Sequence, residues 1–329
     1  MMVAAVLSVL LLLSPRAAAS AQEPAPGLQE LDPHRRRSTL YVAARGSHEV
    51  LVLTRDQGEV IAAIPAGKRP SGLAARRDGD RIYVACAGSH AVQVIDGAAR
   101  RVIDTIVLPH GAAPLHVALS EDARTLYVAA SGIDSVLVLD AAGHHQIAEI
   151  PVPGRPSRLA LSPDGRRLYA LCPRAGRLHV IDTSRAQVIA SAAVGSGASD
   201  LAVDRSRGTV YVARSGAPSL AVLDEGSSQP REAPIPWAAE AVAVDPRTGR
   251  LLLSSPAAAR IVEASPGTGA SAQETSMAEP WRLAVDPEGK NLYALSARRG
   301  VLAFVDRIRG AVVRDVPVGK EPWDLVLIP

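Results

Sequence analysis

Charged or titratable residues recur along this chain of 329 residues at a nearly constant interval. Five of them are separated by 42, 42, 82 (twice 41) and 42 residues: His116, Arg158, Asp200, Arg282 and Asp324. A sixth, Glu240, lies one position before the point where the missing member of the series would fall. Imidazole, guanidinium and carboxylate groups transfer protons, hold anions or pair with one another. The spacing indicates that a repeated fold brings all six to one place.

Two interpretations of this set differ in function. Because both signs of charge are present, the groups can form a ring of ion pairs that lets neighbouring segments meet without burying a lone charge. Alternatively, they line a funnel for a small polar or zwitterionic ligand, since binding sites place a few polar groups on a concave surface. In an enzyme or a cofactor-handling protein, His116 and Arg158 would be the candidate acid, base or anion-holding groups.

The tryptophans lie in the same part of the repeat as these charged residues. The chain has three tryptophans, and aromatic residues make up only 3% of it. Trp281 and Trp323 each lie directly before a charged member of the series, and Trp237 lies in the corresponding segment one repeat earlier. An indole offers a large apolar face and an N–H donor, which suits stacking on a ligand or docking a partner protein. The alternative is that these side chains only plug the top of a channel.

Four of the eight histidines are expected to lie on one face of the fold. His48 and His90 occupy equivalent positions in successive repeats, while His110 and His116 fall in the segment that enters the third repeat. Converging imidazoles could hold a transition metal or supply an axial ligand to a haem-like tetrapyrrole. The competing interpretation is that His48 and His90 are turn residues, because Asp134 stands at the same place in the next repeat. The spacing leaves metal binding undecided.

Motifs for several other kinds of chemistry are absent. The chain has no glycine-rich phosphate loop, Gly-x-Ser-x-Gly elbow, His-Glu-x-x-His or Cys-x-x-Cys sequence, and the absence of Cys-x-x-Cys-His excludes covalent c-type haem. The formal net charge of +3 gives no electrostatic reason to expect nucleic acid as a partner. Cys86 and Cys172 occupy equivalent strand positions two repeats apart, roughly 15 Å from each other on a ring, which predicts two free, buried thiols.

A repeat of 41 to 44 residues must position all of these side chains. Each copy contains four short runs rich in Val, Ile and Leu, closed by Gly, Pro, Asp or Ser, and such runs are typical of strands joined by turns. Four strands this short cannot bury both faces alone, so each sheet must stack on the next around a ring. One position marks the seven copies: Tyr41, Tyr83, Tyr127, Tyr169, Tyr211, Leu252 and Tyr293. Aspartates that recur at strand ends are expected to accept backbone hydrogen bonds in turns: Asp96, Asp140, Asp182, Asp224 and Asp306.

The two ends of the repeated region predict how the ring closes. Residues 38–42 form a second-strand motif without a first strand, and residues 322–327 form a first-strand motif with nothing after it. The last segment is therefore expected to complete the first blade and to remove exposed sheet edges. The sequence predicts an all-β fold, a seven-bladed β-propeller whose first blade is closed by the C-terminal strand.

The runs Leu-Tyr-Val-Ala, Val-Ile-Asp, Ser-Pro-Asp-Gly and Val-Pro-Gly-Arg-Pro resemble the YVTN-type propeller repeat of exported bacterial and archaeal proteins over residues 38–329. The sixth copy departs most, with Leu252 for tyrosine and Glu263 for aspartate. The resemblance implies the fold but no single activity. Similar propellers serve as surface-layer modules, as haem- or quinone-associated periplasmic proteins and as lyases.

The first 21 residues have the pattern of a signal peptide, an apolar run followed by Ala19-Ser20-Ala21. Residues 22–37 are expected to be a flexible linker that leads into the propeller at 38–329. We therefore expect a periplasmic or extracellular protein with no transmembrane segment after cleavage, and a monomer. The leading hypothesis is a non-enzymatic propeller that binds a small polar ligand or a partner protein at the channel mouth. The alternative is a periplasmic enzyme or cofactor-handling propeller for a metal, a quinone or a haem-like ligand; the sequence indicates no specific cofactor.

Overall fold

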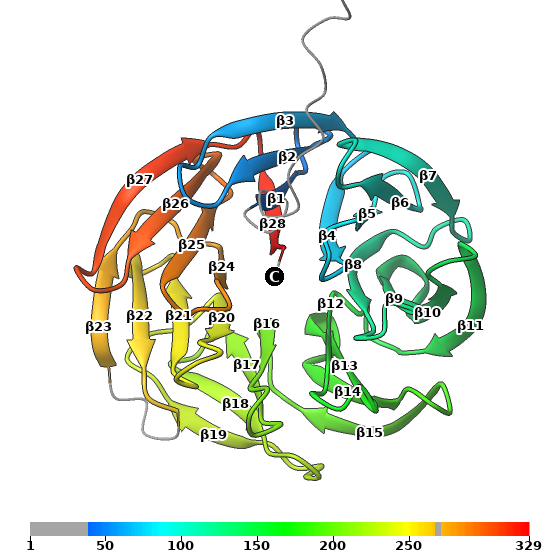
Figure 1. Ribbon diagram of the computed structural model, residues 1–329. Coiled ribbons are helices and arrows are strands. Elements are labelled where there is room, and N and C mark those ends of the chain that lie inside the picture. Colours follow the sequence, from blue (N-terminus) through cyan, green and yellow to red (C-terminus); the bar gives the residue numbers. More distant parts are fainter. Residues whose placement is uncertain (1–38, 267–270, 329) are drawn as a thin grey trace, which may run out of the picture. The chain divides into compact units, whose positions relative to one another are not determined.

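The computed structural model describes residues 39–266 and 271–328, which fold into seven four-stranded antiparallel sheets arranged as blades around a central axis (Figure 1). The prediction of a seven-bladed β-propeller is confirmed. The segments assigned to a signal peptide and a linker, residues 1–21 and 22–37, lie outside the described residues. In the part of the chain that the structure describes, no helix is long and apolar enough to span a membrane.

Within each blade the strands follow one another from the axis outward. Blade 1 contains β28 (Pro322–Leu327), β1 (Thr39–Ala44), β2 (Glu49–Thr54) and β3 (Val60–Pro65). Blade 2 contains β4 (Pro70–Ala75), β5 (Arg81–Cys86), β6 (Ala91–Asp96) and β7 (Arg101–Val107). Blade 3 contains β8 (Pro114–Leu119), β9 (Thr125–Ala130), β10 (Ser135–Asp140) and β11 (His145–Pro151). Blade 4 contains β12 (Arg158–Leu161), β13 (Arg167–Cys172), β14 (Arg177–Asp182) and β15 (Gln187–Ala193).

The other three blades repeat this order. Blade 5 contains β16 (Ala198–Val203), β17 (Val210–Arg214), β18 (Ser219–Leu223) and β19 (Arg231–Pro234). Blade 6 contains β20 (Ala241–Val244), β21 (Leu251–Ser255), β22 (Arg260–Ala264) and β23 (Ser271–Ser276). Blade 7 contains β24 (Arg282–Val285), β25 (Asn291–Ser296), β26 (Val301–Asp306) and β27 (Ala311–Pro317). Two single-turn 3₁₀ segments, η1 (Ser131–Ile133) and η2 (Pro173–Ala175), join strands in blades 3 and 4.

The C-terminal strand closes the ring as the incomplete motifs predict. Strand β28 pairs antiparallel with β1, so that Leu40 lies opposite Leu327 and Ala43 lies opposite Asp324 (Figure 1). The innermost position of blade 1 is therefore filled by the last segment of the chain, and β1 has a partner on each side. This pairing protects the β1 edge from association with other chains.

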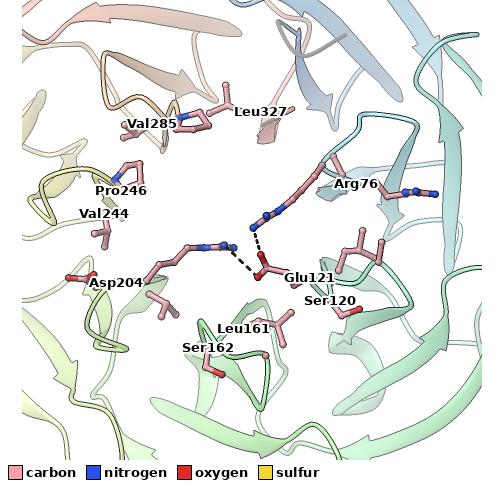
Figure 2. A pocket seen from close by; sticks show the side chains of 18 of the residues that line it. Arg76, Ser120, Glu121, Leu161, Ser162, Asp204, Val244, Pro246, Val285 and Leu327 are labelled. Carbon is pink, nitrogen blue, oxygen red and sulfur yellow. Dashed lines mark hydrogen bonds and ion pairs between the residues drawn. The ribbon is translucent and has the colours of Figure 1, made fainter. Parts of the chain in front are cut away.

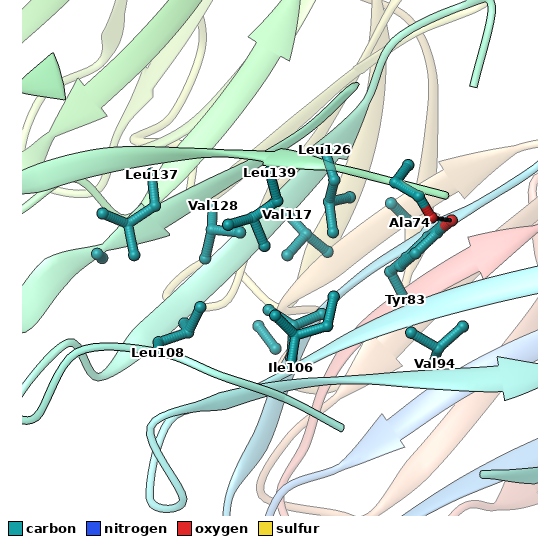
Figure 3. Close-up of a cluster of buried hydrophobic side chains, with 14 of the residues drawn as sticks. Ala74, Tyr83, Val94, Ile106, Leu108, Val117, Leu126, Val128, Leu137 and Leu139 are labelled. Atoms are coloured by element: carbon teal, nitrogen blue, oxygen red, sulfur yellow. Dashed lines mark hydrogen bonds between the residues drawn. The ribbon is translucent and has the colours of Figure 1, made fainter. Parts of the chain in front are cut away.

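Hydrophobic side chains fill the space between neighbouring blades, with one cluster at each of the seven interfaces in the described structure. Figure 3 shows the cluster between blades 2 and 3, in which Leu126 and Leu139 of one sheet face Val94 of the other. The repeat tyrosine adds a polar link. Tyr83 Oη donates to the carbonyl oxygen of Ala141 in the next blade, 3.1 Å away. Burial of the ring and satisfaction of its hydroxyl together explain why tyrosine recurs at this position.

The interface between blades 6 and 7 replaces that link with ion pairs. Leu252 has no hydroxyl group, and the cluster here contains seven buried residues, against eleven to fifteen at the other interfaces among the described residues. Arg307 of blade 7 reaches back to blade 6, with Nη2 2.7 Å from Asp245 Oδ2 and 3.1 Å from Glu263 Oε2. The two departures of the sixth repeat thus compensate each other, because Glu263 supplies the contact that the missing tyrosine does not.

Four of the five turn aspartates, and both cysteines, have their expected structural roles. Asp96 Oδ1 accepts the N–H groups of Ala98 at 3.0 Å and Ala99 at 2.9 Å. Asp140, Asp182 and Asp306 do the same in their own turns, whereas Asp224 pairs with Arg231 instead. Cys86 and Cys172 are free and buried in different interfaces, and burial raises the pKa of their thiols to about 11 and about 12.

Candidate functional site

The innermost strands of the seven blades surround the axis, and each end of this channel carries a pocket. We call the end where these strands begin the strand-start mouth and the end where they finish the strand-end mouth. The strand-start pocket has a volume of about 270 Å³ and the strand-end pocket a volume of about 640 Å³. The repeat places equivalent residues of all seven blades around each mouth. The charge and polarity particular to a mouth therefore come from residues that differ from their equivalents in the other blades.

At the strand-start mouth the charged residues meet across the axis. Asp324 Oδ2 of blade 1 lies 3.6 Å from Arg158 Nη1 of blade 4 and 3.7 Å from His116 Nε2 of blade 3. Asp200 of blade 5 places Oδ1 3.6 Å from Arg158 Nε. Its Oδ2 lies 3.2 Å from Arg282 Nη1 of blade 7. Four charged side chains and the imidazole of His116, which come from five blades, form one connected network rather than a ring of separate neighbouring pairs.

Backbone hydrogen bonds fix the orientation of this network. Asp324 Oδ2 accepts the N–H of Leu73 at 3.1 Å, and His116 Nδ1 accepts the N–H of Leu159 at 3.4 Å. Gly72 stands at the repeat position that His116 occupies in the next blade, and a Cβ atom there would lie 2.5 Å from His116 Cα. Glycine in blade 2 therefore makes room for the histidine of blade 3.

Desolvation controls the charge states in the network. Desolvation, followed by repulsion from Arg158, holds the pKa of His116 well below its usual 6.5, so the imidazole is neutral at pH 7. Because Nδ1 accepts a hydrogen bond, the proton of this neutral ring lies on Nε2, toward Asp324. Burial likewise raises the pKa of Glu240 above 4.5. Arg158 and Arg282 are only 5% and 6% exposed, so both guanidinium groups depend on the two aspartates for compensation.

The two neighbouring tryptophans form a stack beside the network. The Trp281 and Trp323 rings are half-buried, and their centroids lie 5.6 Å apart at an interplanar angle of 48°. Arg45 Cζ lies 4.2 Å from the centroid of Trp323, and Arg282 Cζ lies 5.5 Å from that of Trp281. Cation–π contacts at both ends hold the indoles in place. The sequence analysis did not identify Arg45. Comparison of the seven copies could have found it, because its equivalents in the other six carry no charge: Ala87, Ser131, Pro173, Ser215, Pro256 and Ala297.

Five of the nine residues singled out from the sequence line the strand-start pocket: Arg158, Glu240, Trp281, Arg282 and Trp323. Three more, His116, Asp200 and Asp324, belong to the ion-pair network with which Arg158 and Arg282 make contact. The structure places Trp237 elsewhere. It packs against the hydrophobic cluster between blades 5 and 6, with Arg260 Cζ 5.3 Å from its ring centroid.

His48 and His90 act in turns, as the alternative interpretation predicts. His48 Nδ1 accepts the N–H of Arg69 at 3.2 Å, and His90 Nδ1 accepts the N–H of Ala113 at 3.0 Å. Asp134 does the same with its carboxylate, and all three residues have positive φ. The His90 and His110 rings lie 5.7 Å apart, tilted by 47°. Within residues 39–266 and 271–328, no group of three His, Cys, Asp or Glu side chains is placed to hold a metal ion.

The strand-end mouth is a second pocket that the sequence analysis did not identify. Glu121 lies over the hollow, where two guanidinium groups approach it (Figure 2). These belong to Arg77, which donates a hydrogen bond to Glu121, and to Arg205, whose Nη1 lies 3.9 Å from Glu121 Oε2. The last apolar residue of each inner strand also lines the pocket: Ala75, Leu119, Leu161, Val203, Val244, Val285 and Leu327.

The repeat does contain a signal for this second site. Arg77, Glu121 and Arg205 occupy the proline position of the Ser-Pro-Asp-Gly turn. The other four copies keep proline there: Pro163, Pro246, Pro287 and Pro329. Comparison of the seven copies at this turn position identifies the three charged residues. The comparison made at the start of the inner strands could not identify them, because it concerned other positions of the repeat.

Solved structures with similar architecture include hydrazine synthase of Kuenenia stuttgartiensis, with a TM-score of 0.72 and 19% identity over 82% of this chain and 92% of that chain. Another is the dihydro-heme d1 dehydrogenase NirN in complex with DHE, with a TM-score of 0.69 and 16% identity over 93% of this chain and 78% of that chain. A functionally unknown protein from Desulfotomaculum acetoxidans DSM 771 has a TM-score of 0.75 and 12% identity over 88% of this chain and 98% of that chain. At these identities the likeness concerns the fold alone.

No curated protein matches the sequence. The profile of one family, the YNCE-like β-propellers, matches residues 16–206, which is more than half of the 329 residues. Its match agrees with the β-propeller fold described above. The chain therefore belongs to the YNCE-like β-propeller family.

Proposed function

We propose that this protein is an exported, non-enzymatic binding propeller whose strand-start pocket holds a small polar, preferably zwitterionic, ligand against Trp281 and Trp323. Export to the periplasm or the cell exterior rests on the N-terminal sequence pattern. The proposal for the pocket rests on the side chains that line it. A hypothesis of a metal or haem-like cofactor gains no support from the histidines, because His48 and His90 already accept backbone hydrogen bonds in turns.

One observation carries the proposal. Three residues that line the pocket have buried N–H groups with no hydrogen-bond partner among the described residues: Arg158 at Nη2, Trp281 at Nε1 and Arg282 at Nε. A buried donor without an acceptor typically costs about 1–3 kcal/mol. Of the twelve buried side-chain atoms without a hydrogen-bond partner among the described residues, four belong to these three residues. Because these atoms have almost no accessible surface, a ligand oxygen would satisfy them only after the surrounding side chains shift.

The charges around the pocket favour a ligand of low net charge. Arg158 and Arg282 are balanced by Asp200 and Asp324, and Glu240 adds a carboxyl group whose pKa is raised by burial. A carboxylate or carbonyl group facing the arginines and an amino group facing Glu240 would match this arrangement. The tilted indole pair would then cover the flat or aliphatic part of the same molecule.

The test is a thermal-shift screen of the mature protein with the L-amino acids as simple zwitterionic probes. A ligand present at 100 times its Kd stabilises the protein by about 2.7 kcal/mol, which is readily detected. We expect a bulky apolar amino acid to raise the Tm of the wild type and of the Trp237→Ala control. It should not raise the Tm of the Trp323→Ala or Trp281→Ala variants, because these lack one face of the pocket.

The unliganded stability of the same variants separates binding from packing. Removal of a fully buried tryptophan costs about 3–5 kcal/mol, whereas a half-buried indole at a pocket rim should cost much less. If Trp323→Ala and Trp281→Ala each lose several kcal/mol in urea denaturation, the indoles are packing elements and the binding proposal is wrong. The absence of any Tm shift across the panel of amino acids counts equally against a zwitterionic ligand.

A further inference from the structure

The strand-end mouth has the size and lining of a ligand site, and it is independent of the pocket proposed above. Its volume of about 640 Å³ falls within the range of roughly 300–1,000 Å³ typical of small-molecule pockets. The wall is a belt of seven apolar side chains, one from the end of each inner strand. Such a belt offers apolar contact to a ligand but no hydrogen bonds that would fix its orientation.

Orientation would come from the charged group at the rim (Figure 2). Arg77 and Arg205 share the single carboxylate of Glu121, which leaves one formal positive charge. Arg205 Nη1 lies 3.9 Å from Glu121, too far for a hydrogen bond, and the side chains of Arg77 and Arg205 are 64% and 71% exposed. Their remaining N–H groups are therefore accessible to an anion that approaches from solvent.

The other charges around this pocket are already compensated. Arg76 Nη2 lies 2.7 Å from Asp78 Oδ2. Asp204 is buried in its turn, where Oδ1 accepts the N–H of Ser206 at 2.8 Å and Oδ2 faces Arg207. The excess positive charge of the rim thus resides on the arginines of blades 2 and 5, on either side of the Glu121 carboxylate.

The fold itself does not require these three charged residues. Proline occupies their position in the other four copies, and in the six copies whose turn is described, the turn forms with either kind of residue. Exposed ion pairs also contribute little to stability, typically about 0–1 kcal/mol. Their convergence on one opening from blades 2, 3 and 5 therefore calls for another explanation.

We propose that the strand-end mouth binds an amphiphilic monoanion, a carboxylate attached to an aliphatic or aromatic body. The carboxylate lies at Arg77 and Arg205, where it competes with or lies beside Glu121. The apolar body enters the channel and contacts the belt, including Leu161 and Val244. Affinity comes mainly from burial of the body, and preference for the anion comes from the two guanidinium groups.

Isothermal titration calorimetry of the full mature protein with octanoate tests this proposal, and 1-octanol serves as the uncharged probe of the same length. We expect octanoate to bind more tightly than 1-octanol. The double variant Arg77→Gln, Arg205→Gln should weaken octanoate roughly tenfold, which corresponds to about 1.4 kcal/mol, and should leave 1-octanol unchanged. Val244→Thr keeps the shape of the side chain but adds a hydroxyl group, and it should weaken both probes.

Two control variants locate the binding. Arg166→Gln removes an exposed arginine from the neighbouring blade-4 turn that does not line the pocket, and it should have no effect. Trp323→Ala alters only the opposite mouth and should also leave octanoate binding unchanged. Circular dichroism and Tm of each variant establish that it is folded.

Three results would overturn the proposal. The first is no detectable octanoate binding at about 5 mM, where a site with a Kd of 1 mM would be mostly filled. The second is equal affinity for octanoate in the wild type and in the Arg77→Gln, Arg205→Gln variant. The third is loss of octanoate binding in Trp323→Ala, which would assign the probe to the strand-start pocket instead.

Discussion

Asp324 provides the most direct test of the ion-pair network across the axis. Its Oδ2 atom lies 3.6 Å from Arg158 and 3.7 Å from His116 and accepts the N–H of Leu73 at 3.1 Å. Because Arg158 is 5% exposed, removal of this carboxylate leaves a buried guanidinium with Asp200 as its remaining counter-ion. Loss of one partner of a buried ion pair typically costs about 3–5 kcal/mol.

We expect Asp324→Ala to lower the free energy of unfolding by about 3 kcal/mol, the lower end of that range, since Asp200 still compensates part of the charge. For a domain of this size, about 2 °C per kcal/mol gives a Tm lower by about 6 °C. Asp324→Asn retains an oxygen that accepts the Leu73 N–H and removes only the charge, so it should lose about 1–2 kcal/mol. Urea denaturation followed by circular dichroism measures both losses.

A matched control and a double variant complete the test. Asp164→Ala removes an exposed turn aspartate outside the network and should cost no more than about 1 kcal/mol. Arg158→Met combined with Asp324→Leu removes both ends of the pair and should cost less than the sum of the single substitutions, because no unpaired charge remains. If Asp324→Ala loses less than about 1 kcal/mol, water in the channel already solvates Arg158 and the network does not stabilise the fold.

Two further predictions concern closure and acid stability. Deletion of residues 323–329 removes most of β28 and exposes the edge of β1, so we expect strong destabilisation and aggregation; an unchanged Tm by calorimetry would contradict the closure argument. Burial acts to raise the pKa of Asp245, but hydrogen bonds from the Arg247 N–H and from Arg307 lower it below 3.8. Its contribution to stability is therefore present above about pH 4 and is lost as the pH falls through the folded-state pKa. We therefore expect the Tm of Asp245→Asn to fall less than the Tm of the wild type when the pH is lowered below about 4. An equal fall of Tm in both proteins would refute this prediction.

The repeat made the architecture predictable in detail. Seven copies define seven blades, and the incomplete motifs at the two ends fix the phase in which β28 joins β1. The candidate site was only partly predictable, because the repeat gives the position of a Cα atom on the ring but not how far a side chain extends. Arg158 and Asp324 come from blades 4 and 1, yet their long and short side chains meet across the axis. For Trp237, proximity along the repeat did not mean proximity in space, because its ring packs against an interblade cluster.

Some residues that depart from the repeat are explained by packing, and others are not. Leu252 departs from tyrosine, but Glu263 and Arg307 supply the interblade contact that is lost, so packing accounts for both changes. Arg77 and Arg205 depart from proline in the same way, yet no lost contact is restored by them. They are exposed, they add little stability, and they lie over an apolar pocket. A departure whose lost contact is restored elsewhere in the fold has a structural explanation. A departure that restores no contact and adds little stability is better explained by ligand binding. For this reason we propose a ligand at the strand-end mouth as well as in the strand-start pocket.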